Sequence, residues 1–395
     1  MMGRLNEDDI LSIVINSEDT TYLSHNYHPF PAKFIPGLPS FLIKNFSSPG
    51  DLVLDPFCGS GTTLVEAKLL NRDAVGIDVH PIAVLMSRVK TNPLSNGEIE
   101  DIKSLIEKVE AICSSYRHIK TSQKSLFFEQ PKELEDYVKW IPKFPGRDHW
   151  FKEEVLDELA IIKSVIKEGN LSEEAQEYLL LGLSAIIVQV SNQEGETRYA
   201  AIKKNIEAGQ VFDLFIKKIQ DMNSRMLEFK KKASNSKISV IWGDLRSLTG
   251  IGDRKADLVV TSPPYANTYD YYLYHKLRMY WLNYDYKYVQ ENEIGSRDKH
   301  SSKKQGLEYY INDMRKCFEK IALWIKKDKY AVFIIGDSVI SGEQIRGDKV
   351  IIELAEEAGM SLIDKVDYSQ DLSSKMFNTA FRKKNKLEHV ILFKS

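Results

Sequence analysis

Two short segments of the chain combine residue types that can bind a cofactor and hold a reactive amine. The first is LDPFCGSGTT, from Leu54 to Thr63, which a helical pattern follows directly. Where a strand ends in a glycine-containing turn that opens into a helix, the backbone can approach a bound ligand closely. We therefore expect a polar ligand above Gly59 and Gly61.

An acidic residue at the end of the next predicted strand supports this interpretation. Asp78 follows Gly61 by 17 residues, where its carboxylate can accept hydrogen bonds from both hydroxyls of a ribose. The turn and the acid together predict a nucleoside-containing cofactor. The alternative is a tight turn beside a solvated acid, because only two of the three glycines of the dinucleotide fingerprint are present.

The second segment is Ser262-Pro263-Pro264-Tyr265, directly after a predicted strand. Two prolines lack N–H donors and form a stiff exit, in which the carbonyls of Ser262 and Pro263 can accept hydrogen bonds from an amino group. Tyr265 offers an aromatic face on which a flat ring can stack. The alternative is a rigid loop without chemistry, but the segment follows a cofactor turn on the same predicted sheet.

Short β-rich runs separated by helical patterns predict that parallel βαβ units position these segments. Seven strands are expected, at residues 51–55, 73–78, 237–242, 257–261, 330–335, 361–366 and 389–393. Between the second and third strands, Leu and Ile at helical spacing predict helices at residues 99–116, 153–167, 172–190 and 210–232. The prediction is an α/β, Rossmann-like domain of residues 1–94 and 237–395, with a helical insertion of residues 95–236.

Composition limits the partners and the location. With 54 basic and 56 acidic residues, the chain cannot bind nucleic acid by bulk charge and would need local patches. Three cysteines cannot form a disulfide framework, and His25 and His28 have no partners at metal-ligand spacing, so no metal is expected. The N-terminus has no secretory pattern, and the apolar stretch 179–190 is too short to cross a bilayer, which favours a cytoplasmic protein without a membrane partner.

The two segments, in this order, resemble the motifs of S-adenosylmethionine-dependent DNA amino-methyltransferases, which methylate N4 of cytosine or N6 of adenine. HPFPAKF (28–34) resembles the segment that lines the methionine end of the cofactor, and Trp242-Gly243-Asp244 resembles the adenine-contacting position. The resemblance covers residues 22–92 and 237–395 and implies a seven-stranded methyltransferase sheet with S-adenosylmethionine as cofactor. The cofactor-binding residues that it implies are Lys33, Phe34, Asp55, Phe57, Cys58, Gly59, Ser60, Gly61, Thr62, Asp78, Val79, Asp244 and Ser262.

The catalytic residues expected on this basis are Ser262, Pro263, Pro264 and Tyr265. An exocyclic amine on a heteroaromatic ring is a poor nucleophile, and acceptors that hold its protons would localise its lone pair and aim it at the sulfonium methyl. The target base must be flipped out of the duplex, and Tyr265 would clamp it. Methylation at cytosine C5 is disfavoured because it needs a nucleophilic cysteine, and none follows a proline at this strand end.

Ser262 at the first position of the motif favours cytosine N4 by resemblance, and adenine N6 is the alternative. Further alternatives are an RNA amino-methyltransferase, which usually has Asp or Asn before Pro-Pro and an added RNA-binding domain, and a recognition subunit without catalysis. The intact motif argues against the last of these. The expected setting is a restriction–modification or related defence system, with double-stranded DNA and a possible cognate restriction endonuclease as partners.

Basic residues near the predicted active-site edge are candidates for DNA contact, although a solvated surface is the ordinary alternative for each. The candidates are Arg198, Arg297, Lys303, Arg382 and Lys383. The insertion is the only large unassigned block and is therefore a possible target-recognition domain. Arg147, His149 and Trp150 in one of its loops are candidate base readers, with a core position as the alternative for Trp150.

Overall fold

The computed structural model describes residues 4–16, 19–121, 136–303, 305–369 and 386–395. Its main sheet contains all seven strands expected from the sequence, in the order β10-β11-β7-β6-β1-β2-β5. These strands are β1 (Leu52–Asp55), β2 (Asp73–Asp78), β5 (Ile238–Trp242), β6 (Ala256–Thr261), β7 (Ile325–Gly336), β10 (Ser361–Ser369) and β11 (Leu387–Lys394). β11 is antiparallel to both of its neighbours, whereas the pairs from β7 to β5 are parallel. The predicted Rossmann-like α/β sheet is confirmed.

The central strands are mostly apolar because both faces of the sheet are covered. β1 and β6 are buried along their whole length. One face packs against α13 (Leu307–Trp324) and α14 (Gly347–Glu357), and the other packs against α1 (Glu7–Ile15), α2 (Gly37–Phe46) and α3 (Thr62–Leu69).

β7 begins five residues earlier than the sequence predicted, at Ile325 rather than Tyr330. Its pairing with β6 shifts register between Ala256↔Ile325 and Leu258↔Tyr330, and Asp328 has a positive φ of 62° there. The extra residues therefore form an irregular, bulged start of the strand, which the alternation of side chains does not reveal.

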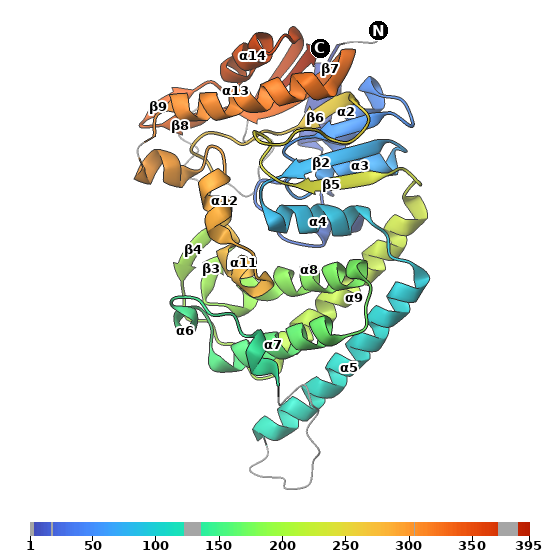
Figure 1. Cartoon of the computed structure of the whole chain (residues 1–395), viewed down its shortest axis with the longest axis vertical. Coiled ribbons are helices and arrows are strands. Elements are labelled where there is room, and N and C mark those ends of the chain that lie inside the picture. The colour runs from blue at the N-terminus through green and yellow to red at the C-terminus, as the bar shows by residue number, and fades with distance from the viewer. Residues whose placement is uncertain (1–3, 17–18, 122–135, 304, 370–385) are drawn as a thin grey trace.

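Between α4 (Pro81–Thr91) and β5, the chain forms long helices close to the predicted positions. They are α5 (Asn96–Thr121), α7 (Glu153–Glu168), α8 (Glu173–Val190) and α9 (Gln210–Lys232). In Figure 1 these helices lie below the β5 edge of the sheet, with α4 between them and the strands. α8 and α9 pack closely, since a Cβ on Gly182 would clash with Cδ1 of Ile219.

The core of these helices is continuous with residues outside the predicted insertion. Ile82 of α4 and both Leu277 and Trp281 of α11 (Lys276–Leu282) are buried in it. The division at residues 94 and 237 therefore stays a prediction. None of the described helices is both long enough and apolar enough to span a bilayer.

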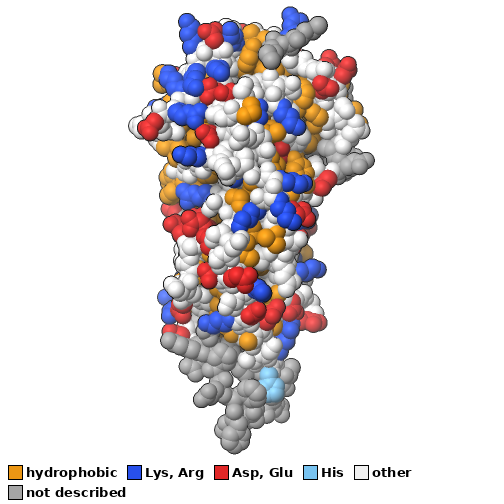
Figure 2. Space-filling view, turned by 90° about the vertical axis from the view of Figure 1, so that its right-hand side faces the viewer, with side chains coloured by type: hydrophobic (Ala, Val, Ile, Leu, Met, Phe, Trp, Pro, Cys, Tyr) orange, Lys and Arg blue, Asp and Glu red, His pale blue; other side chains and the backbone are white. Residues whose placement is uncertain are grey.

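Small elements that the sequence analysis missed lie on the side to which the parallel strands point. The chain from α9 enters β5 at the right of Figure 1, so the carboxyl ends of the parallel strands face left. The same side carries α6 (Arg147–Trp150), α12 (Tyr286–Asn292) and two hairpins, β3 (Gln193–Gly195) with β4 (Arg198–Ala201) and β8 (Ser338–Ile340) with β9 (Glu343–Ile345). Figure 2 shows the opposite, right-hand side, where Lys and Arg are interspersed with Asp and Glu.

Candidate active site

A hydrogen bond joins the first motif to the second. Asp55, the last residue of β1, is buried and accepts a hydrogen bond from Oγ1 of Thr261 at 2.6 Å. Thr261 ends β6 and directly precedes Ser262, so the two strand exits are held side by side. Burial raises the pKa of Asp55 to about 6. Both strand ends were expected at one edge of the sheet, and this hydrogen bond fixes their positions relative to each other.

The glycines of the first turn serve mainly to pack it. Gly59 and Gly61 have positive φ angles of 48° and 80°. A Cβ on Gly61 would lie 2.6 Å from Oγ of Ser87 in α4, and one on Gly59 would lie 3.4 Å from the Phe30 ring. The missing side chain of Gly61 therefore makes room for α4, and the ligand contact expected at Gly59 and Gly61 stays a prediction.

Asp78 ties the end of β2 to the same turn. Its Oδ2 accepts a hydrogen bond from N of Gly59 at 2.9 Å, and its Oδ1 accepts one from N of His80 at 2.8 Å. Burial raises the pKa of this carboxyl to about 6. Because each carboxylate oxygen can accept two hydrogen bonds, Asp78 retains capacity for two further donors, such as ribose hydroxyls. Val79 follows and accepts a hydrogen bond from the Trp242 indole at 3.0 Å.

The remaining residues of the turn are mostly buried. Cys58 donates its backbone N–H to the carbonyl of Ile77, and burial raises the pKa of its thiol well above the usual range, which disfavours the thiolate. The carbonyl of Ser60 accepts a hydrogen bond from the buried Lys90 ammonium at 2.9 Å. Thr62 is buried at the start of α3, and Phe57 packs partly against the core between the sheet and α13.

Three other residues of the predicted cofactor set already have protein partners. Lys33 donates to the carbonyl of His25 at 3.1 Å, and burial lowers its pKa to about 8. Phe34 packs against the core beneath α2. Asp244 forms a two-point ion pair with Arg246, with Nε–Oδ1 and Nη2–Oδ2 distances of 2.9 and 2.7 Å. Their contact with cofactor stays a prediction.

The second motif leaves β6 in the expected way. Ser262 and Pro263 follow Thr261, the last residue paired with β7, so their carbonyls lie beyond the ladder. The carbonyl of Pro264 accepts a hydrogen bond from the Tyr310 hydroxyl at 2.8 Å. The Tyr265 hydroxyl donates to Oε1 of Glu388 at 3.0 Å.

Two residues that were not predicted contact this motif and the segment that follows it. A Cβ on Gly295 would lie 2.9 Å from the carbonyl oxygen of Tyr265, which explains the glycine there. Glu293 is buried and accepts hydrogen bonds from the backbone N–H groups of Tyr271 and Tyr272 at 2.8 and 3.1 Å. Burial raises the pKa of Glu293 to about 8. No local pattern marks either residue, because their partners lie more than twenty positions away.

The candidate DNA-contacting residues that the structure describes are exposed. Arg198 pairs with Glu194 at 2.8 Å, and its side chain is 72% exposed. Arg297 is exposed and donates to the carbonyl of Thr268 at 2.9 Å, and Lys303 lies 3.5 Å from Asp298. Arg382 and Lys383 lie outside the described residues.

The candidate base readers lie in and beside α6. Arg147 pairs with Asp148 at 2.9 Å, and His149 is exposed. The Trp150 ring packs against Tyr199 with a centroid distance of 4.4 Å and borders the helical core. This position is close to the core position that was the alternative for Trp150.

A buried cluster of Asp337, Asp348 and His389 has three side-chain ligand atoms within 4.8 Å of one another. Arg346 and Lys365 pair with Asp348 at 2.8 and 2.6 Å, so cations already compensate these carboxylates. Burial lowers the pKa of His389, but hydrogen bonds to its carboxylate partners outweigh burial and raise it overall. Because Arg346 and Lys365 supply the opposite charge, we interpret the cluster as a salt-bridge network.

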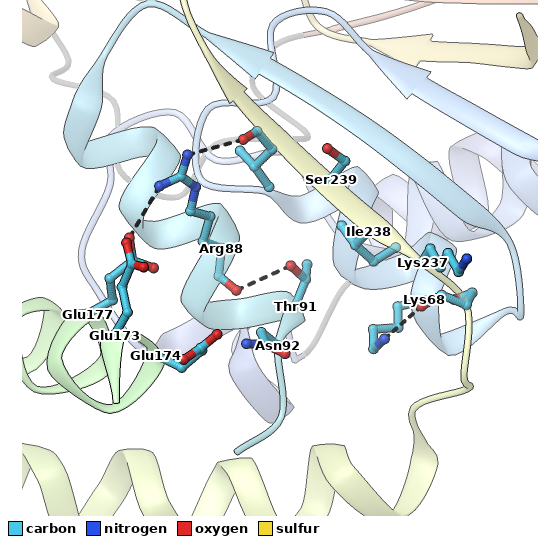
Figure 3. A pocket seen from close by; sticks show the side chains of 12 residues that line it. Lys68, Arg88, Thr91, Asn92, Glu173, Glu174, Glu177, Lys237, Ile238 and Ser239 are labelled. Carbon is cyan, nitrogen blue, oxygen red and sulfur yellow. Dashed lines mark hydrogen bonds and ion pairs between the residues drawn. The ribbon is translucent and has the colours of Figure 1, made fainter. Parts of the chain in front are cut away.

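A pocket of about 540 Å³ lies elsewhere, at the amino end of β5 (Figure 3). Its charged walls are partly paired, since Arg88 contacts Glu177 at 3.2 Å and Lys68 donates to the carbonyl of Ser236 at 2.9 Å. The two motifs end strands at the opposite edge of the sheet, so this pocket is not the candidate site.

Known proteins resemble much of this chain. A family model described as DNA methylase, N6_N4_Mtase, matches residues 7–87 and 256–395, which include both motifs and Asp78. The Type II methyltransferase M.MvaI of Kocuria varians is 25% identical over 388 residues, covering 85% of this chain and 82% of that protein. M.MjaII of Methanocaldococcus jannaschii is 24% identical over 434 residues, covering 90% and 78%.

Among solved structures, a TehB-like SAM-dependent methyltransferase of Corynebacterium glutamicum is 11% identical, with a TM-score of 0.32 and coverage of 90% of this chain and 86% of that one. The predicted insertion, residues 95–236, falls entirely between the two segments that the family model matches.

Proposed function

Because the chain belongs to the N6_N4_Mtase family of DNA methylases, we propose that it is a site-specific DNA methyltransferase acting on the exocyclic amine of a flipped base. S-adenosylmethionine is the cofactor and supplies an electrophilic methyl group on a sulfonium. The observation that carries the proposal is the 2.6 Å hydrogen bond between Thr261 and Asp55. This bond holds the second motif, which would present the amine, next to the turn of the first motif, which would bind the cofactor.

The residues of the second motif suit a direct transfer. The carbonyls of Ser262 and Pro263 lie beyond the β-ladder and are oriented by a rigid backbone, so they can accept the two amine protons. Accepting these protons localises the nitrogen lone pair, and positioning then supplies most of the acceleration. Tyr265 would stack against the base, and the buried Cys58 takes no part in a covalent step.

We favour cytosine N4 over adenine N6 because a serine occupies the first position of the motif. Restriction–modification is the proposed setting, since the relatives above are named Type II methyltransferases. The helical insertion is the proposed target-recognition region. Its β3–β4 hairpin and α6 lie on the side to which the strand ends point, which supports this role (Figure 1).

Radiolabelled S-adenosylmethionine tests the substrate. Purified protein is incubated with plasmid and phage DNA in one arm and with bulk tRNA in the other, and labelled nucleic acid is digested to nucleosides. We expect label in DNA, as N4-methylcytosine. N6-methyladenine would replace the base assignment, whereas label in tRNA would refute the DNA substrate. Cofactor binding without label in either arm would favour a recognition subunit.

Tyr265→Ala tests the motif within the same assay. We expect kcat to fall by on the order of a hundredfold while the Kd for cofactor changes less than about twofold, since the ring would contact the base only. Tyr309→Ala is the matched control, because that tyrosine is 55% exposed on α13. Equal losses in both variants would argue against a base-clamping role.

A further inference from the structure

Glu388 is separated from the second motif by more than a hundred residues but contacts it directly. Its Oε1 accepts the hydrogen bond of the Tyr265 hydroxyl at 3.0 Å. β11 lies between β7 and β10, and β6 lies on the far side of β7. The Glu388 side chain therefore reaches past a whole strand to meet the exit of β6.

The sheet holds the backbone of Glu388 in place and leaves space for its side chain to extend toward Tyr265. Glu388 pairs with Gly336 on β7 and with Tyr368 on β10, so its backbone is held on both sides. Cross-strand partners project their side chains on the same face of a sheet. Gly336 has no side chain, which leaves the space between Glu388 and Tyr265 open.

The Glu388 carboxylate lies near the hydroxyl groups of Tyr265 and Tyr368, which stay protonated. Burial raises the pKa of Tyr265 well above its usual value, and the Glu388 charge raises it further. Tyr368 is buried and its pKa is raised by burial first and then by the same carboxylate. Both tyrosines thus remain donors at physiological pH.

A tyrosine that follows two prolines has a stiff backbone, but its side chain can still rotate about two bonds. Anchoring the hydroxyl removes that freedom and fixes the plane of the ring. We propose that Glu388 is a positioning residue that holds the Tyr265 ring in the orientation needed to stack against the flipped base. This role rests on the proposed function, because the ring matters only if a base is presented to it.

A double-mutant cycle tests the role with labelled S-adenosylmethionine and plasmid DNA. We expect Glu388→Ala and Tyr265→Phe each to lower kcat by on the order of tenfold, with the double variant no worse than either single one. Glu388→Gln keeps an acceptor oxygen and should retain activity within about threefold of wild type. The Kd for cofactor should stay unchanged in all variants. Glu356→Ala, at an exposed position of α14, is the matched control.

Two outcomes would overturn the proposal. One is a further tenfold loss when Glu388→Ala is added to Tyr265→Phe, since the two residues would then act independently. The other is a Glu388→Gln variant as impaired as Glu388→Ala. Glu388→Met, of similar length but without an acceptor, replaces the alanine variant if the latter folds poorly.

Failure of the proposed function gives a different result. Wild-type protein that labels no DNA would refute that function, and the contact would then be tested by thermal unfolding. If the contact exists, the losses in Tm for Glu388→Ala and Tyr265→Phe are not additive. Additive losses would refute the contact whatever the enzyme does.

Discussion

Asp78 illustrates how one side chain can serve both the fold and the cofactor. Its carboxylate holds Gly59 and His80 through their backbone N–H groups, and burial raises its pKa from 3.8 to about 6. A carboxyl with a raised folded pKa makes the cofactor-free protein less stable as the pH rises from about 4 to 6, because the folded state binds more protons there. Cofactor binding has the opposite dependence, since ribose hydroxyls need a deprotonated acceptor.

We therefore expect the Kd for S-adenosylmethionine to increase about tenfold per pH unit below pH 6. Asp78→Asn should weaken binding by about tenfold at pH 7.5 and flatten the pH dependence, because the amide does not titrate. Titration calorimetry between pH 5 and 8 measures both effects. Asp51→Asn, which changes a carboxylate at the amino end of β1, is the control. A cofactor affinity that survives Asp78→Ala would contradict the assignment of this strand end.

At the scale of elements, a buried arginine connects the second motif to the helical insertion. Arg278 lies on α11, which follows the motif, and its side chain is fully buried. It donates to the carbonyl of Ser184 in α8 at 2.9 Å and pairs with Glu196, at the turn of the β3–β4 hairpin, at 2.8 Å. One buried side chain therefore joins the hairpin, α8 and a helix that follows Tyr265.

Replacing this arginine should cost stability. Arg278→Met leaves Glu196 and the Ser184 carbonyl without their donor, and we expect the free energy of unfolding to fall by about 3 kcal/mol. Urea denaturation followed by circular dichroism measures the change. Arg198→Met removes an exposed ion pair on the same hairpin and should cost less than about 0.5 kcal/mol. Similar losses for the two variants would show that burial does not decide the contribution.

The strands were predictable from sequence because each central strand is a continuous apolar run closed by a turn signal. The β3–β4 and β8–β9 hairpins were not, since three- and four-residue strands give no alternation to detect. In the site, residues contiguous with a motif could be named. Glu388 and Glu293 could not, because their contacts depend on sheet order and on loop packing rather than on spacing along the chain.

For the whole molecule, the net charge of −2 makes the position of the cations more informative than their number. Arg198 begins β4, and Arg297 and Lys303 follow α12, elements that lie on the left side of Figure 1. The opposite side carries both signs of charge, as Figure 2 shows, and a mixed surface attracts a polyanion weakly. DNA lying against the strand ends would contact these three cations and not the mixed charges of the opposite side.

Salt-dependent binding of a fluorescent duplex distinguishes these two sides. We expect Arg198→Ala, Arg297→Ala and Lys303→Ala together to raise the Kd on the order of tenfold at 100 mM KCl. The slope of log Kd against log salt should also fall by up to about 0.9 for each lost phosphate contact. Lys68→Ala with Lys237→Ala, beside the pocket at the amino end of β5, should leave both quantities nearly unchanged. Equal changes in Kd and slope for the two sets of substitutions would mean that DNA binds by overall charge. The strand-end side would then not be the DNA-binding surface.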